Sequence, residues 1–187
     1  MGKRITDKEY EQILEAAHGD DAEALYKLAR MYYHGGYVSR DRIKAFKYYD
    51  QAFVAGANIS GEDFIYMADG HRQDGDNYAA LEFYRMAAEK GEGFGYECMG
   101  DIYFEQEKYE RAWEYFNKPE EKNNLALYRI GYMYEMGLAV DKDEKKARSY
   151  YETVIKDTEG DPACELDESY QAAVEAIKRL DGKGQSA

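Results

Sequence analysis

The chain is poor in the residues from which most metal sites and nucleophilic sites are built. Its two cysteines, Cys98 and Cys164, stand in no CxxC or CxxH pattern, which excludes a disulfide framework and a zinc site of that kind. The three histidines lack ligand spacing, and HExxH and GxSxG are absent. We therefore expect no catalytic constellation, no metal and no cofactor, and predict that the protein is not an enzyme.

Long hydrophobic runs are also missing. No apolar stretch approaches the roughly 18 residues of a membrane-spanning helix, and the N-terminal residues pass directly into polar sequence, so neither a membrane span nor a secretory signal is expected. Together with two cysteines that are most simply interpreted as reduced thiols, this predicts a cytoplasmic location.

Positive charge is in short supply. The chain has 25 Lys and Arg against 38 Asp and Glu, a net charge of −13, which argues against nucleic-acid binding because phosphates demand a basic face. The acidity is concentrated in residues 61–124, where 7 basic and 16 acidic side chains give a net −9. This region either provides charge for solubility or attracts a basic partner.

The chain contains one helical sequence pattern that occurs four times. Apolar or aromatic residues recur at i, i+3, i+4 and i+7, the spacing of one helix face, around the equivalent positions Leu28, Met67, Met99 and Ile130. A second pattern follows each time, with Ala and then an aromatic residue four positions later, at Ala45/Tyr49, Ala80/Tyr84, Ala112/Phe116 and Ala147/Tyr151. Self-similarity at this period predicts stacked helical hairpins.

The first and fourth repeats share a longer loop with its own pattern. Tyr-x-x-Gly-x-x-Val-x-x-Asp-x-x-Lys-Ala occurs at residues 32–45 and again at residues 134–147. These units resemble Sel-one-like repeats (SLR), and the two shorter units resemble tetratricopeptide repeats. The resemblance implies an all-α, right-handed superhelix of about four helical hairpins that binds other proteins.

The ends of the chain are expected to cap the array. We predict an N-terminal capping helix in residues 1–20, opened by a Thr6-x-x-Glu9 capping box. Four repeats follow at about 21–58, 59–92, 93–124 and 125–157. Residues 158–187 would then hold a last helix, at about 163–180, and a disordered tail from residue 182. In the third repeat, Pro119 is expected to shorten the second helix.

The resemblance implies that the first helices line the concave side of the array, and periodicity identifies the residues that point away from the packing positions. These are Tyr26, Arg30, Tyr33, Asp69, Arg72, Glu97, Asp101, Phe104, Glu105, Tyr128, Tyr132 and Glu135. Aromatic residues are good anchors, and carboxylates select Lys or Arg, so the set predicts a groove for a basic protein or peptide. The alternative is that several of these tyrosines pack helix against helix.

The sequence thus predicts a non-catalytic adaptor or scaffold. Contact through the convex face, or self-association through one end, are alternatives to groove binding. A more specific possibility is a bacterial inhibitor that neutralises an effector. The competing class is an enzyme with an unrecognised site in the groove.

Overall fold

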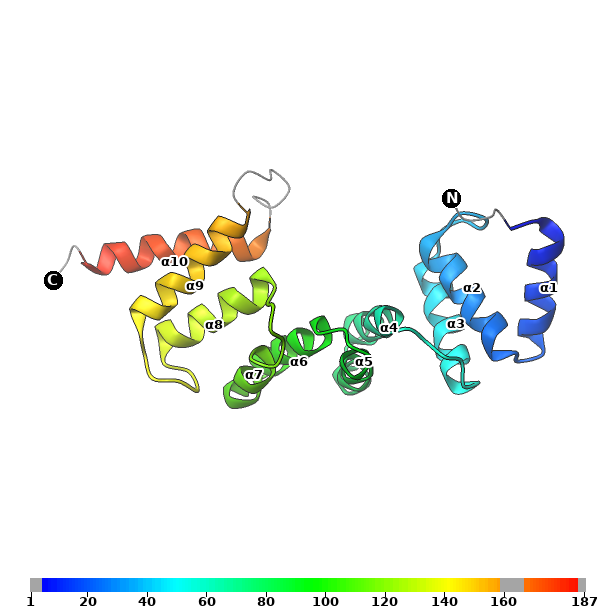
Figure 1. Ribbon diagram of the computed structural model, residues 1–187, viewed down its shortest axis with the longest axis horizontal. Helices are drawn as coiled ribbons and strands as arrows, with labels where there is room; N and C mark the ends of the chain where they lie inside the picture. Colours follow the sequence, from blue (N-terminus) through cyan, green and yellow to red (C-terminus); the bar gives the residue numbers. More distant parts are fainter. Residues whose placement is uncertain (1–4, 159–166, 185–187) are drawn as a thin grey trace. The chain divides into compact units, whose positions relative to one another are not determined.

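A computed structural model describes residues 5–158 and 167–184, and these residues form helices and no strand (Figure 1). The helices are α1 (Asp7–His18), α2 (Ala22–His34), α3 (Arg42–Val54), α4 (Gly61–Gln73), α5 (Asn77–Glu89), α6 (Phe94–Glu105), α7 (Tyr109–Phe116), α8 (Asn124–Met136), α9 (Glu144–Thr158) and α10 (Glu168–Gly184). The expectation of an all-α fold is confirmed.

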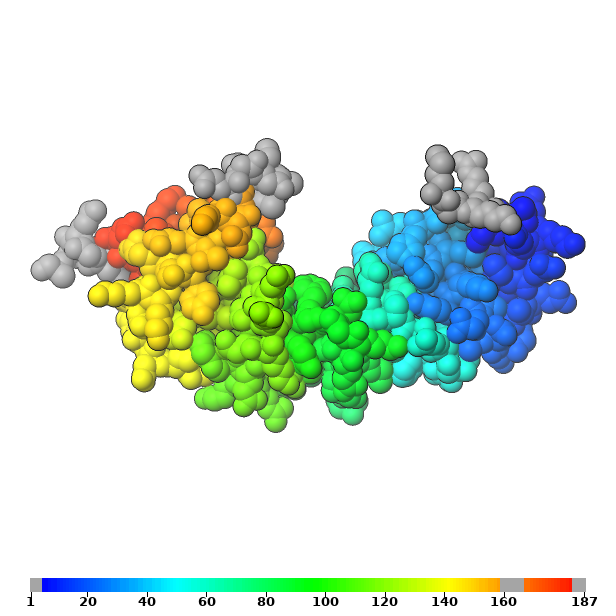
Figure 2. Space-filling model, in the orientation of Figure 1, coloured from blue at the N-terminus to red at the C-terminus, as the bar shows by residue number. Residues whose placement is uncertain are grey.

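The chain divides into two compact units. Unit 1 comprises residues 1–90 and contains α1 to α5, and unit 2 comprises residues 91–187 and contains α6 to α10. Consecutive helices pair as hairpins, α2 with α3 and α4 with α5 in unit 1, and α6 with α7 and α8 with α9 in unit 2. Within each unit, side chains fill the gaps that separate the ribbons (Figure 2).

The core of each hairpin is built at the repeated positions. Leu28, Met67 and Ile130 are fully buried on the first helices, and the aromatics of the second helices, such as Tyr49 and Phe116, are equally inaccessible. Glycine matters at Gly100, because a Cβ there would come within 2.6 Å of the Phe116 ring. The two helices of this hairpin therefore approach too closely for any side chain at that position.

A second, outward-facing contact also repeats in every hairpin. One ring from each first helix stacks on one ring from the second, in the pairs Tyr32–Tyr48, His71–Phe83, Tyr103–Tyr115 and Tyr134–Tyr150. In three hairpins a cation lies over the first of these rings, namely Lys44, Arg111 or Lys146. This explains why a basic residue precedes the buried alanine. His71 takes the place of a tyrosine in the second hairpin, and its stack on Phe83 makes it a packing residue.

Helix ends follow their sequence signals. Thr6 and Glu9 form the predicted capping box on α1. Asp41 caps α3 by accepting from the Lys44 amide at 3.0 Å, and Asp143 accepts from the Lys146 amide at the same distance. As predicted, the helix of the third repeat is short: α7 ends at Phe116.

The C-terminal predictions need correction. Helix α10 runs from Glu168 to Gly184, so the predicted end near residue 180 is wrong, as is disorder at residues 182–184. Asp181 is held to α9 by Arg148, with 2.6 Å between Nη2 and Oδ1, and the helix continues for one further turn. Residues 163–166, the predicted start of this helix, and residues 185–187 lie outside the described residues, as does Cys164.

Candidate protein interface

The twelve residues predicted for the concave face differ in their exposure to solvent. Six are buried: Tyr26, Tyr33, Glu97, Asp101, Phe104 and Glu135. Four are half-buried (Asp69, Arg72, Tyr128 and Tyr132), and two are exposed (Arg30 and Glu105). The expectation that all twelve line an open surface is therefore wrong for the six buried residues. They form seams between successive helices, and for Tyr26 and Tyr33 this is the alternative that the sequence had left open.

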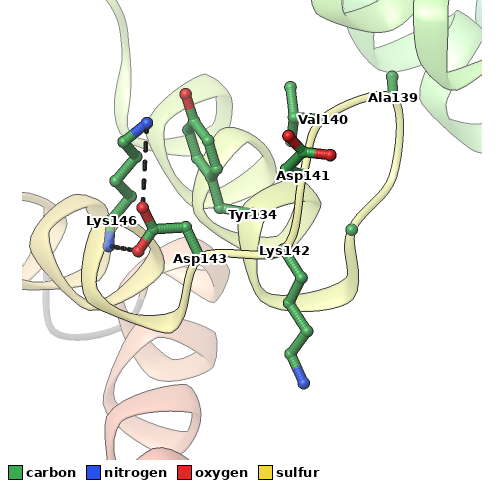
Figure 3. A pocket seen from close by; sticks show the side chains of 8 residues that line it. Tyr134, Ala139, Val140, Asp141, Lys142, Asp143 and Lys146 are labelled. Atoms are coloured by element: carbon green, nitrogen blue, oxygen red, sulfur yellow. Dashed lines mark hydrogen bonds and ion pairs between the residues drawn. The ribbon is translucent and has the colours of Figure 1, made fainter.

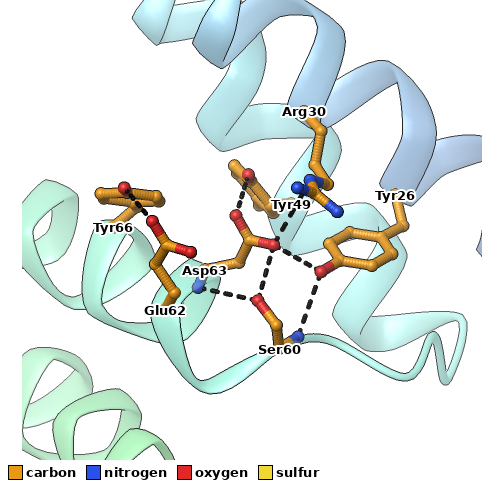
Figure 4. A network of polar contacts seen from close by, with 7 residues as sticks. All are labelled: Tyr26, Arg30, Tyr49, Ser60, Glu62, Asp63 and Tyr66. Atoms are coloured by element: carbon orange, nitrogen blue, oxygen red, sulfur yellow. Dashed lines mark hydrogen bonds and ion pairs between the residues drawn. The ribbon is translucent and has the colours of Figure 1, made fainter. Parts of the chain in front are cut away.

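In unit 1 the seam is centred on Asp63, in the first turn of α4, which is 2% exposed. Tyr49 donates to its Oδ1 at 2.6 Å, while Tyr26 and Ser60 both donate to Oδ2 (Figure 4). Arg30 lies further away, with Nε 3.7 Å from Oδ2. Burial raises the pKa of the Tyr49 and Tyr26 hydroxyls, so both remain donors. One carboxylate thus joins α2, α3 and α4.

Beside this network, Tyr33 of α2 stacks on Tyr66 of α4 with 4.1 Å between ring centroids. Tyr66 donates to Glu62 at 2.7 Å, a bond that raises the pKa of Tyr66 to about 12. Two guanidinium groups approach the same Tyr33 ring: Arg40 lies 5.6 Å and Arg42 lies 5.8 Å from its centroid. The Tyr33 ring, although buried, therefore interacts with two guanidinium groups that lie at the protein surface.

In unit 2, the seam between α6 and α8 uses two buried acids. Glu97 accepts from the Asn123 amide at 2.7 Å, and burial raises the pKa of this carboxyl. Arg129 donates from Nε to Asp101 at 3.1 Å, and its guanidinium also lies 4.4 Å from the centroid of Phe104. Glu97 and Asp101, which were predicted to select a basic partner, thus form hydrogen bonds within the fold.

The C-terminal helix is held by Glu135 of α8. This side chain is almost fully buried, accepts from the Tyr151 hydroxyl at 3.0 Å, and receives two bonds from Arg179 of α10, at 2.9 and 2.7 Å. The bond to Glu135 raises the pKa of Arg179, and burial raises that of Tyr151. A bidentate guanidinium pair therefore fixes the terminal cap to the last hairpin.

The half-buried members of the set are also in contact with neighbours. Asp69 accepts from the Tyr84 hydroxyl. Tyr128 lies 5.6 Å from the ring of Tyr151, and Tyr132 lies 6.0 Å from that of Phe104. These residues present part of their surface to solvent while resting on the core, which is the arrangement of an amphipathic anchor.

Sequence reasoning missed the partners that bury these residues, chiefly Asp63, Arg129 and Arg179. For Asp63 a signal existed. It lies four positions before an apolar repeat position, where the other repeats have small residues: Ala24, Gly95 and Ala126. A carboxylate in a position otherwise kept small indicates a buried, bonded acid.

Exposed charge is distributed unevenly in the α6–α7 hairpin. Its cations lie over tyrosine rings: Lys108 and Arg111 are 6.0 and 5.4 Å from the Tyr103 centroid, and Lys118 is 4.5 Å from that of Tyr115. Its exposed acids form what we call the acidic segment, consisting of Glu105, Glu107, Glu110 and Glu114. Within the described residues, the last three of these form no ion pair.

The loop between α8 and α9 borders an open cavity of about 800 Å³, lined by Tyr134, Gly137, residues 139–143 and Lys146 (Figure 3). Two of its charged groups, Asp143 and Lys146, serve the loop itself. Asp143 caps α9 and lies 3.9 Å from Lys146 Nζ, which in turn lies 5.0 Å from the Tyr134 centroid. The repeat's loop pattern therefore has a structural explanation.

Two features are absent from residues 5–158 and 167–184. These residues contain no group of three or more His, Cys, Asp or Glu side chains arranged to hold a metal ion. None of their helices combines the length and apolar character needed to cross a bilayer.

Comparison with known proteins adds a family and a fold. The Sel1 repeat profile matches residues 22–53, 65–92 and 124–153. A 78-residue stretch is 35% identical to the ERAD-associated E3 ubiquitin-protein ligase component HRD3 of Candida glabrata. That stretch is 41% of this chain but 9% of the yeast protein, so the chain spans less than a tenth of this relative.

Two crystal structures show the same fold. One is c5321, a protective antigen present in uropathogenic Escherichia coli strains displaying an SLR fold, at 20% identity and TM-score 0.60 over 92% of this chain and 40% of the other. The other is a Sel1 repeat protein from Oxalobacter formigenes, at 23% identity and TM-score 0.58 over 92% of this chain and 49% of the other. The helical hairpins are thus those of an SLR solenoid.

Proposed function

The chain belongs to the Sel1-like repeat family, and on this premise we propose that it is a non-catalytic adaptor that binds a basic protein or peptide. Sel1 repeats generally mediate protein–protein interaction. The relative from Candida glabrata is named as a component of a ubiquitin ligase, which supports a role within a protein assembly. A non-catalytic role is supported by the buried carboxylates, since Asp63 and Glu135 are bound by donors that hold helices together.

The observation that carries the proposal is the acidic segment of unit 2. Glu110 and Glu114 are exposed and lie four residues apart on α7, a spacing at which like charges repel and cost a few tenths of a kcal/mol. The hairpin's own cations, Lys108, Arg111 and Lys118, are placed over rings instead. A Lys- or Arg-rich partner would relieve this repulsion and would be attracted over several ångströms.

The aromatic part of the proposed contact comes from α8. Tyr128 and Tyr132 are half-buried, already ordered by their neighbours Tyr151 and Phe104, and lose little further freedom on binding. Of the twelve residues predicted from the sequence, the six that are not buried remain our candidates for direct contact: Arg30, Asp69, Arg72, Glu105, Tyr128 and Tyr132.

The test is capture from a lysate of the source cells by the immobilised protein, followed by mass spectrometry. The variant E110K/E114K reverses the acidic segment. The matched control E11K/E15K makes the same change of charge at the same spacing on exposed positions of α1. We expect a basic protein to be retained by the wild type and by the control and lost from E110K/E114K. Identical captured proteins on all three surfaces would refute the acidic contact.

A further inference from the structure

Unit 1 contains a strongly cationic stretch within this acidic protein. Residues 27–47 include one acid, Asp41, and six basic residues: Lys27, Arg30, Arg40, Arg42, Lys44 and Lys47. All six basic side chains are exposed. Because the whole chain has a net charge of −13, this stretch is a local reversal of sign rather than a general property of the surface.

The two arginines nearest the α2–α3 loop lack an acidic partner. Arg40 and Arg42 both approach the Tyr33 ring, and in residues 5–158 and 167–184 neither forms an ion pair. Asp41 stands between them in sequence, but its carboxylate caps α3 and lies 3.8 Å from Lys44 Nζ. Two ordered guanidinium groups are therefore available for an external carboxylate.

Two of the six basic residues lie at the positive end of a helix dipole. Arg42 and Lys44 occupy the first turn of α3, which contains no acidic residue. The positive end of the helix dipole disfavours cations there and favours an anion. An external carboxylate at this point would interact with both the dipole and the side chains.

A groove lies directly beside the cations, between α3 and α4, with a volume of about 380 Å³. Its apolar part is formed by Phe46 and by Ile43, which is 72% exposed. The Phe46 ring packs directly on Gly70 of α4, since a Cβ there would come within 2.3 Å of that ring. Arg42 and Lys47 also line the groove.

The remaining charged residues of the groove are two acids, Asp50 and Asp74, which lie away from the start of α3. Asp50 lies 3.4 Å from His71 Nε2, and Asp74 follows the end of α4. The groove thus offers an apolar floor with cations at the start of α3 and acids elsewhere, so a ligand is oriented by charge.

We propose that this cationic groove (Arg42, Ile43, Phe46, Lys47 and Gly70), together with Arg40 of the preceding loop, binds an acidic segment of a partner protein. An apolar side chain of the segment packs on Ile43 and Phe46, and adjacent carboxylates pair with Arg40 and Arg42. The site goes beyond the proposed function, because it lies in the other unit and selects the opposite charge.

The experiment measures fluorescence anisotropy of two labelled peptides, Glu-Glu-Leu-Phe-Glu-Glu and Lys-Lys-Leu-Phe-Lys-Lys, titrated with the full chain. The variant R40Q/R42Q removes the two free guanidinium groups. The control R111Q/K118Q removes two cations that also lie over tyrosine rings, but in unit 2. Ile43→Ser removes the exposed apolar contact without opening the core.

We expect the glutamate peptide to bind about tenfold more weakly to R40Q/R42Q and about threefold more weakly to Ile43→Ser, with the control unchanged. The proposal is overturned if the wild type does not bind the glutamate peptide, or if the control weakens binding as much. Sedimentation of the wild type at low salt adds one further outcome. A dimer that R40Q/R42Q dissociates would make a second copy the occupant and would also overturn the proposal.

Discussion

In the α2–α3 hairpin Lys44 lies over the ring of Tyr32, which stacks on Tyr48. In the α6–α7 hairpin Arg111 lies over the ring of Tyr103, which stacks on Tyr115. The outer packing of the two hairpins is therefore the same. Their exposed charge is opposite, since the first carries free arginines and the second carries the acidic segment. Because stacked rings and buried residues hold each hairpin together, the charge of the exposed residues can differ between hairpins without loss of packing.

The inner packing of the two hairpins differs as well. The first has Ala29 on α2 and Tyr49 on α3, and the second has Gly100 on α6 and Phe116 on α7, at equivalent positions. Tyr49 needs an acceptor for its hydroxyl and finds Asp63. Phe116 needs none and packs against the glycine instead. The same space is filled by a hydrogen-bonded ring in one case and by a phenylalanine ring packed on a glycine in the other.

Tyr49→Phe should give the largest loss of stability. It removes the donor to Asp63 Oδ1, and Tyr26 and Ser60 both bond the other oxygen. A buried charged acceptor without its donor costs about 2 kcal/mol. Urea unfolding monitored by circular dichroism measures this loss. Tyr48→Phe, in the outer ring pair, is the matched control, and equal stability of the two variants would show that the hydroxyl bond contributes nothing.

Gly100→Ala should cost less, about 1–2 kcal/mol. Overpacking against Phe116 destabilises the fold by about 1–3 kcal/mol, and the higher helix propensity of alanine offsets part of this loss. The companion change Phe116→Leu in the Gly100→Ala background should recover stability by making room for the new methyl group. Additive losses in the double variant would contradict the assigned contact.

Glu97→Gln should give the smallest effect, visible as a change with pH. Burial raises the pKa of folded Glu97 above its ordinary 4.5, so its contribution to stability is present at low pH and is lost as pH rises through the folded pKa. The glutamine variant lacks this loss and can still accept from the Asn123 amide. Its stability relative to the wild type should therefore increase between about pH 4 and pH 7. A difference that is constant with pH would argue against a raised pKa.

Much of the fold could be predicted because its signals are local. The caps at Thr6, Asp41 and Asp143, the buried alanines and the short α7 before Pro119 each depend on residues a few positions apart. The end of α10 was missed because it depends on a contact between Arg148 and Asp181, which lie 33 residues apart.

The candidate site could be predicted only in part for the same reason. Periodicity indicates which face of a helix a residue occupies, but it does not show whether another helix covers that face. Tyr26 and Glu135 lie on the predicted face, and they are buried because Asp63 and Arg179 come from helices further along the chain. The free guanidinium groups of Arg40 and Arg42 were missed because their environment depends on the fold of the α2–α3 loop.

The most direct test of the account is a nuclear magnetic resonance titration of the isotope-labelled chain with the two peptides in turn. The lysine peptide is predicted to shift the backbone amides of residues 105–114, and the glutamate peptide those of residues 40–47 and 70–73. This result would establish two surfaces of opposite charge, one in each unit. Shifts in the same unit with both peptides, or in neither unit, would contradict it.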